Sequence, residues 1–328
     1  MKYRETVDGI GSVSEVGLGC WQIGGADWGE VSETDAIGIM HAAADSGVTF
    51  FDTADVYGLG RSEELVGKFL TETAANITVA TKLGRFPTPG WPSNFEESSI
   101  RAHTEASLTR LGVDRLALTQ LHCVPTEVLR RGDVFDYLRT LEHEGKIERF
   151  GASVESMEEA LICLEQPGLA SLQIIFNIFR QKPIETVFKL AKEKGVSLIV
   201  RLPLASGLLT GKFTANTTFP EQDHRNYNRD GAAFNVGETF AGLPFVTGLE
   251  LVEKIRPHVP DGISMAEMAL RWCIDYDAVT VVIPGAKSQQ MAASNAAASD
   301  LPRLSEDLHT ALAALYESQV KQHIRGPN

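Results

Sequence analysis

The chain has 328 residues, of which 43% are hydrophobic and 22% are charged, as expected for a globular protein with a large core. Its formal net charge of -13 argues against a general nucleic-acid-binding surface, because phosphates are bound by clustered Lys and Arg. No apolar run approaches the roughly 18 residues that span a bilayer, and the charged first residues show no signal peptide.

Short apolar and β-branched runs predict eight strands that alternate with helical patterns. The expected strands are residues 15–19, 48–52, 77–82, 115–122, 148–153, 171–177, 196–202 and 278–285. The expected helices are residues 33–46, 62–73, 96–111, 126–144, 156–166, 184–194, 244–257, 265–276 and 289–298. Ser32 and Ser62 lie at the positions expected for helix N-caps, and Gly47 and Gly195 lie where helices are expected to end.

This alternation indicates parallel βαβ units. Periodicity alone does not separate a closed barrel from an open doubly wound sheet, but the count of eight favours an α/β (β/α)8 TIM barrel. Two segments lie outside the repeat: residues 203–243, a long loop after the seventh strand that we expect to be functional, and residues 305–323, an extra C-terminal helix. We find no interdomain linker and expect residues 1–328 to form one domain.

Polar residues near the ends of three successive predicted strands form a candidate acid–base set. Asp52 ends the second strand and precedes Tyr57, Lys82 ends the third strand and His122 ends the fourth. In a parallel barrel the functional groups gather at these strand ends. A tyrosine hydroxyl has a pKa of about 10. An adjacent ammonium lowers this pKa, and a carboxylate holds that ammonium in place. With a neutral histidine to orient a carbonyl, the set suits carbonyl reduction.

Each residue also has a purely structural interpretation. Asp52 and Lys82 could be a plain interstrand ion pair, His122 a satisfied structural histidine and Tyr57 a loop aromatic. The arrival of all four at the ends of three successive strands is harder to attribute to chance.

The stretch 50–67 (FFDTADVYGLGRSEELVG), with Lys82 and His122 after it, closely resembles the aldo-keto reductases of bacterial type. The resemblance covers nearly the whole chain, from residue 13 to Asn295. It implies a (β/α)8 barrel, no metal, and NADP(H) lying extended across the barrel mouth. It also implies that the four residues above form the catalytic tetrad, with Tyr57 as the proton donor to the carbonyl oxygen.

Further positions match the family's cofactor contacts. Ser153 and Gln173 resemble the pair that binds the nicotinamide carboxamide, although Val154 stands where the family commonly has Asn. Residues 203–212 resemble the pyrophosphate loop, with contacts expected from Pro203, Leu204, Ser206, Gly207, Leu208 and Lys212.

The adenosine end of the cofactor site matches less completely. Gly285 and Lys287 are expected there, Lys287 at the ribose 2'-phosphate, and Asn295 matches an adenine contact. Met291 and Ser294 depart from the family pattern, which weakens the expected preference for NADP over NAD. The alternative for Lys287 is a solvated lysine on a loop.

Arg201 stands where many members of the family place an aromatic ring against the nicotinamide. Its planar guanidinium can also stack, so we expect it to contact the nicotinamide or the substrate. The alternative is an ion pair with an acidic residue of the long loop. For the substrate we expect Trp21, Tyr57 and His122, with further residues at the mouth: Asp27, Trp28, Phe86, Trp91 and residues 216–235.

These features predict an NADP-dependent oxidoreductase that interconverts aldehydes or ketones, sugars and polyols included, with alcohols. The alternative is a nicotinamide-binding regulatory subunit with little turnover, since channel-associated relatives keep the barrel and the tetrad. A metal-dependent hydrolase is disfavoured because the eight histidines include no H-x-H pair. The four cysteines show no C-x-x-C spacing, so reduced thiols in a cytoplasm are expected, with a small-molecule partner only.

Overall fold

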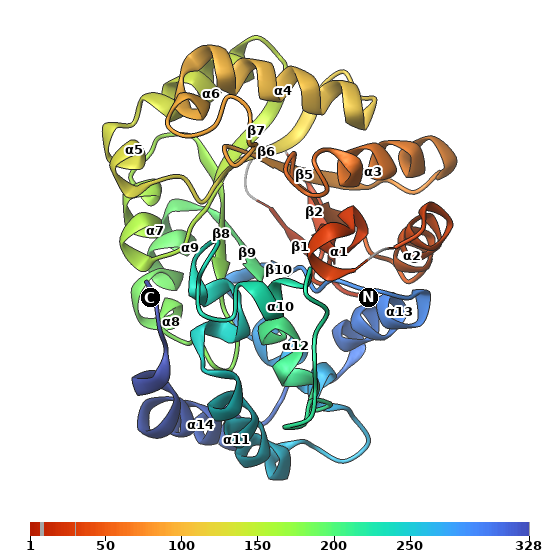
Figure 1. Ribbon diagram of the computed structural model, residues 1–328, viewed down its shortest axis with the longest axis vertical. Coiled ribbons are helices and arrows are strands. Elements are labelled where there is room, and N and C mark those ends of the chain that lie inside the picture. The colour runs from red at the N-terminus through yellow and green to blue at the C-terminus, as the bar shows by residue number, and fades with distance from the viewer. Residues whose placement is uncertain (7–9, 30, 328) are drawn as a thin grey trace.

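The computed structural model describes residues 1–6, 10–29 and 31–327, and its centre is a barrel of parallel strands (Figure 1). Each strand pairs with its neighbours in chain order: β3 (Leu18–Gly19), β4 (Phe50–Asp52), β5 (Thr78–Leu83), β6 (Leu116–His122), β7 (Ile147–Ser153), β8 (Leu169–Ile175), β9 (Ser197–Arg201) and β10 (Val279–Val282). The barrel closes where Gly17 N–H donates to the Val282 carbonyl at 2.8 Å and Gly19 N–H to the Pro284 carbonyl at 3.0 Å. The predicted TIM barrel is confirmed.

Helices surround this barrel (Figure 1). They are α2 (Glu33–Asp45), α3 (Arg61–Glu72), α4 (Glu97–Leu111), α5 (Thr126–Arg131), α6 (Asp133–His143), α7 (Met157–Leu164), α8 (Pro183–Thr186), α9 (Phe188–Lys194), α11 (Phe245–Ile255), α12 (Met265–Ile274), α13 (Gln289–Ala297) and α14 (Glu306–Leu315). Two short helices, α1 (Trp21–Gly24) and α10 (His224–Tyr227), were not predicted.

Three predicted helix boundaries are wrong for local reasons. The helix expected over 126–144 is divided at Gly132, whose φ of 83° is left-handed. The one expected over 184–194 is divided at Val187 into α8 and α9. Ser62 lies inside α3, which Gly60 precedes, and donates to the Cys20 carbonyl at 2.9 Å instead of capping the helix. By contrast, Ser32 caps α2 by accepting from the Asp35 N–H.

A short antiparallel hairpin, β1 (Tyr3–Glu5) and β2 (Ser12–Ser14), covers the amino end of the barrel. The Ser14 N–H donates at 2.9 Å to Thr49, the residue before β4. The side chains that fill the barrel beside the hairpin's Val13 are apolar: Phe50, Ala80, Leu118, Ile199, Val281 and Ile283. This hairpin was not predicted.

The alternation of side chains along the strands carries polar groups to the other end of the barrel. Phe50 points into the barrel and Phe51 packs against the helices, so Asp52 turns inward again at the carboxyl end of β4. The same end bears Lys82 on β5 and His122 on β6. All four cysteines are free and buried. In the part of the chain that the structure describes, no helix is long and apolar enough to cross a membrane.

Candidate active site

The carboxyl ends of the barrel strands open into a cavity of about 960 Å³. Its lining comes from the loop after β3, the loops after the other strands, and the long segment 203–243. The cavity is at the upper end of the size range of ligand pockets, which suits a cofactor together with a small substrate.

The four predicted catalytic residues meet at this cavity. Lys82 is fully buried, and its Nζ donates to Asp52 Oδ1 at 2.5 Å, to the Thr53 carbonyl at 2.8 Å and to the Tyr57 hydroxyl at 3.2 Å. Asp52, Tyr57 and His122 line the cavity itself. The His122 ring stands edge-on to the Tyr57 ring, with centroids 5.7 Å apart.

A close backbone contact positions Tyr57. Gly58 has a φ of 60°, and a Cβ added there would lie 2.2 Å from the Gly24 carbonyl oxygen, so only glycine allows this approach. Gly24 ends α1, which begins at Trp21, and the Trp21 indole stacks on the Tyr57 ring. The contact therefore holds the phenol ring against the Trp21 indole.

The electrostatics of the site keep Tyr57 protonated and His122 neutral near pH 7. Burial raises the pKa of Tyr57 and outweighs the lowering effect of Lys82, so the expected net lowering of this pKa is wrong. Burial lowers the pKa of Lys82, but Asp52 and Tyr57 outweigh it, and the net shift is upward. Burial, with Arg85 and the other nearby cations, holds the pKa of His122 well below its usual value.

Asp52 is held on both carboxylate oxygens. While Oδ1 accepts from Lys82, Oδ2 accepts from Gln173 Nε2 at 2.7 Å and from Gln120 Nε2 at 3.3 Å. Ser153 donates to Gln173 Oε1 at 3.3 Å. Gln173 lines the cavity, whereas Ser153 is 2% exposed and lies behind it.

The loop after β9 forms a second part of the lining. Pro203, Leu204, Ser206, Gly207 and Lys212 line the cavity, whereas the predicted Leu208 is buried beneath it. Residues 205–207 are all left-handed, with φ of 48°, 55° and 98°. The Ser206 hydroxyl fixes this turn by donating to the Glu238 carbonyl at 3.2 Å and accepting from Phe240 N–H at 3.1 Å.

The predicted adenosine residues lie at the far edge of the cavity. Gly285 and Lys287 line it, and Asn295 supports it from behind by donating to the Gly285 carbonyl at 3.2 Å. Lys287 is exposed but not free in solvent, because its ammonium donates to the Trp28 carbonyl and lies 5.5 Å from the Trp28 ring centroid.

Arg201 forms an ion pair with an acidic residue of the long loop, which was the alternative to a nicotinamide or substrate contact. Its Nη1 lies 3.6 Å from Glu238 Oε1 in the long segment, and its Nη2 donates to the Val154 carbonyl at 3.1 Å. The side chain also borders the cavity, so the ion pair does not remove it from the site.

The predicted substrate residues form an aromatic wall. Trp21 lines the cavity together with the other residues expected at its mouth: Asp27, Trp28, Phe86, Trp91, Tyr227, Ala233, Phe234 and Asn235. Asp27 joins the two sides of this wall, since it accepts from Trp21 Nε1 at 3.0 Å and from the Tyr227 hydroxyl at 2.6 Å.

Three charged cavity residues were not predicted: Arg85, Glu155 and Glu238. Arg85 and Glu155 stand two residues beyond the ends of β5 and β7. Lys82 was predicted because functional residues gather at strand ends. The same reasoning predicts Arg85 and Glu155 if the first residues of the following loops are included. Glu238 carries no such local signal.

Comparisons with known proteins agree with this architecture. The sequence model of the Aldo/keto reductase family matches residues 15–317. Aldo-keto reductase YhdN of Bacillus subtilis is 31% identical over 294 residues, which are 88% of this chain and 85% of YhdN. Aldo-keto reductase yakc of Schizosaccharomyces pombe, whose name carries NADP(+), is 28% identical over 85% of this chain and 82% of its own.

Among solved structures, the holo form of aldo-keto reductase AKR11C1 from Bacillus halodurans superposes with a TM-score of 0.78 at 27% identity. The superposition covers 99% of this chain and 100% of that one. The range matched by the family model includes every barrel strand whose end borders the cavity.

Proposed function

The chain belongs to the aldo/keto reductase family and is an oxidoreductase, and on that premise we propose that it interconverts carbonyl compounds and alcohols with NADP(H). Aldehydes and ketones, sugar-like ones included, are the proposed substrates. The observation that carries the proposal is the chain of contacts from Asp52 through the buried Lys82 to the Tyr57 hydroxyl, which lies on the cavity wall. On this proposal residues 1–328 serve as one catalytic domain.

The residues around the cavity fit NADP(H), the cofactor in the name of the Schizosaccharomyces pombe relative. Ser206 and Gly207 of the left-handed turn border the cavity, and Lys212 and Lys287 supply positive charge for phosphates. The proposed contacts are Ser153 and Gln173 for the carboxamide, Arg201 for the nicotinamide, Pro203, Leu204, Ser206, Gly207, Leu208 and Lys212 for the pyrophosphate, and Gly285, Lys287 and Asn295 for the adenosine end. When bound, the cofactor supplies the hydride that no side chain can supply.

The side chains are proposed to manage the proton. Tyr57 gives its hydroxyl proton to the carbonyl oxygen during reduction and takes it back during oxidation. Its raised pKa supports the donor role, because the phenol is protonated near pH 7. Lys82 stays charged and favours the phenolate after transfer, while neutral His122 orients the carbonyl oxygen. Trp21 excludes water from one face of the Tyr57 ring.

A substrate panel tests the proposal. Purified protein is mixed with aldehydes and ketones, and the absorbance of NADPH or NADH is followed in both directions. We expect turnover that requires the Tyr57 hydroxyl and is faster with NADPH. A regulatory subunit would instead bind the cofactor tightly and turn over none of the carbonyls.

A further inference from the structure

Two guanidinium groups share one buried carboxylate at the cavity wall. Arg85, in the loop after β5, and Arg201, at the end of β9, place nitrogens 3.2 and 3.6 Å from the same oxygen of Glu238. The Glu238 side chain is only 6% exposed. Burial raises the pKa of Glu238, but Arg85 and Arg201 outweigh it and lower the pKa to about 2. Glu238 is therefore a firmly ionised partner of both cations.

Glu155 is a weaker member of the same cluster. Among the described residues its one ion pair is with Arg85 Nη2 at 2.7 Å, and its side chain is 20% exposed. Burial and the nearby Glu238 raise the pKa of Glu155 to about 7, so this carboxyl is partly protonated at neutral pH. Two guanidinium charges then face fewer than two full carboxylate charges.

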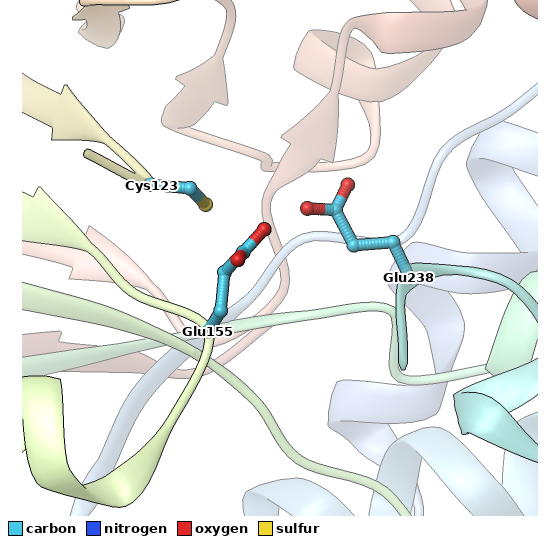
Figure 2. A group of neighbouring side chains, drawn as sticks. All are labelled: Cys123, Glu155 and Glu238. Atoms are coloured by element: carbon cyan, nitrogen blue, oxygen red, sulfur yellow. The ribbon is translucent and has the colours of Figure 1, made fainter. Parts of the chain in front are cut away.

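The acceptors of this cluster converge, as Figure 2 shows for Cys123, Glu155 and Glu238. Their ligand atoms all lie within 4.8 Å of one another, which by itself would suit a metal ion. The same oxygens already pair with Arg85 and Arg201, and Arg201 Nη2 lies 3.6 Å from Cys123 Sγ. A metal ion would lie beside two fixed cations, so the cluster favours an anion instead.

The arginines also keep donor capacity that the protein does not use. Arg201 Nε is buried and finds no acceptor among the residues that the structure describes. Arg85 lines the cavity with its side chain 18% exposed. A ligand acid that ionises more readily than Glu155 would take its place on Arg85, and Glu155 would keep the proton.

The rest of the cavity wall suits the body of such a ligand. Aromatic side chains line the same cavity as the candidate catalytic hydroxyl: Trp21, Phe86, Trp91 and Phe234. Arg201 Nη2 lies 3.6 Å from the Sγ of Cys123, the residue that directly follows His122, and both His122 and Arg85 line the cavity. A substrate carbonyl held at His122 therefore has a guanidinium within the length of a small molecule.

We propose that Arg85, backed by Arg201, forms a carboxylate-binding subsite, so that the preferred substrates are aldehydes or ketones that carry a carboxylate. Glu155 occupies this subsite when no substrate acid does. The inference rests on the proposed carbonyl reductase activity, whose substrate class it narrows.

The test compares 4-formylbenzoate with its methyl ester, which has the same carbonyl and ring but no charge. Binding is measured by calorimetry with NADP+ present, which prevents reduction, and turnover is measured separately with NADPH. We expect the acid to bind at least about ten-fold more tightly than the ester, because its carboxylate can accept a charge-assisted hydrogen bond. In Arg85→Met the acid and the ester should bind equally well, so the ratio of their affinities should fall to about one. In Glu155→Gln the ratio should stay the same or increase. Arg101→Met, which removes an arginine paired with Glu144 on the surface of α4, should leave the ratio unchanged.

Equal binding of acid and ester by the wild-type protein would overturn the subsite, even if both were reduced. Loss of acid binding in Glu155→Gln would also overturn it, because that carboxyl would then be a ligand contact and not a competitor. Tight, Arg85-dependent binding of the acid without any reduction would support the subsite and contradict the reductase proposal. The two ideas can therefore fail separately.

Discussion

The indole of Trp21 lies parallel to the ring of Tyr57, with centroids 5.9 Å apart and 19° between the ring planes. The Lys82 ammonium also lies near the phenol ring, 4.8 Å from its centroid. Packing, not the hydroxyl, therefore sets the direction of this side chain. The hydroxyl can be removed without moving the ring.

The first prediction follows from that packing. Tyr57→Phe should keep the stacked ring and remove the proton donor, so we expect turnover to fall by a factor on the order of 10² to 10⁴. NADPH binding should be nearly unchanged, and both are measured by steady-state kinetics and cofactor titration. Tyr3→Phe is the control, since Tyr3 is 51% exposed and its hydroxyl donates to the Gly47 carbonyl, away from the cavity. Full activity of Tyr57→Phe would remove Tyr57 from its proposed role.

The second prediction concerns the buried pair of Lys82 and Asp52. Lys82→Met leaves the Asp52 carboxylate buried without its cation, which should cost about 3–5 kcal/mol of unfolding free energy and most of the turnover. Asp52→Asn should also destabilise the protein. The double variant should be more stable than the sum of the two losses predicts, because neither charge is left alone. Additive losses in denaturant titrations would contradict a direct pairing.

Cofactor choice is the third prediction. Lys287→Ala should reduce the preference for NADPH by raising its KM while leaving the KM for NADH almost unchanged, because only NADPH carries the 2'-phosphate. Lys189→Ala is the matched control: this α9 lysine side chain is 89% exposed and pairs with Glu193 on the same helix. An unchanged ratio of the two KM values in Lys287→Ala would assign the phosphate to another group.

The fourth prediction concerns Asp55, which the proposed mechanism does not use. Asp55 is fully buried, and neither carboxylate oxygen has a hydrogen-bond partner in the described ranges. Burial, with Glu63, raises its pKa to about 8, against about 3.9 in an unfolded chain. Between these values the folded state holds a proton that the unfolded state has lost, so stability falls as pH rises, by at most about 1.4 kcal/mol per pH unit.

Asp55→Asn should remove this loss. Denaturant titrations between about pH 5 and about pH 8 should show the variant gaining stability over the wild type as pH rises. Asp136→Asn, on the surface of α6 with a side chain 72% exposed, provides the comparison. Identical pH slopes for wild type and Asp55→Asn would mean that Asp55 is ionised in the folded protein.

Much of the barrel and its tetrad could be predicted because the signals are local. The alternation Phe50, Phe51, Asp52 fixes which side chain faces inward at the end of β4, and the same rule serves Lys82 and His122. Helix ends were harder, since the pattern over 126–144 stays amphipathic through Gly132 while the backbone there turns left-handed. The hairpin of three-residue strands β1 and β2 is too short to show a period.

The charged cluster shows where sequence reasoning fails. Glu238 reaches Arg85 and Arg201 only because the long segment folds back across the barrel mouth, and the Ser206 hydroxyl helps to fix that path. The path depends on tertiary packing between distant parts of the chain. The same holds for Tyr57, whose upward pKa shift comes from burial, which sequence spacing does not report.

The distribution of tryptophan gives the protein a built-in optical probe. Of its four indoles, Trp21, Trp28 and Trp91 line the cavity, and Trp272 is fully buried away from it among helices and strands. A molecule that enters the cavity changes the surroundings of three emitters at once, while the fourth provides a constant background. Reduced nicotinamide absorbs light where indole emits, so docking at Tyr57 would quench the emission of Trp21 by energy transfer. Fluorescence can thus follow occupancy without any label.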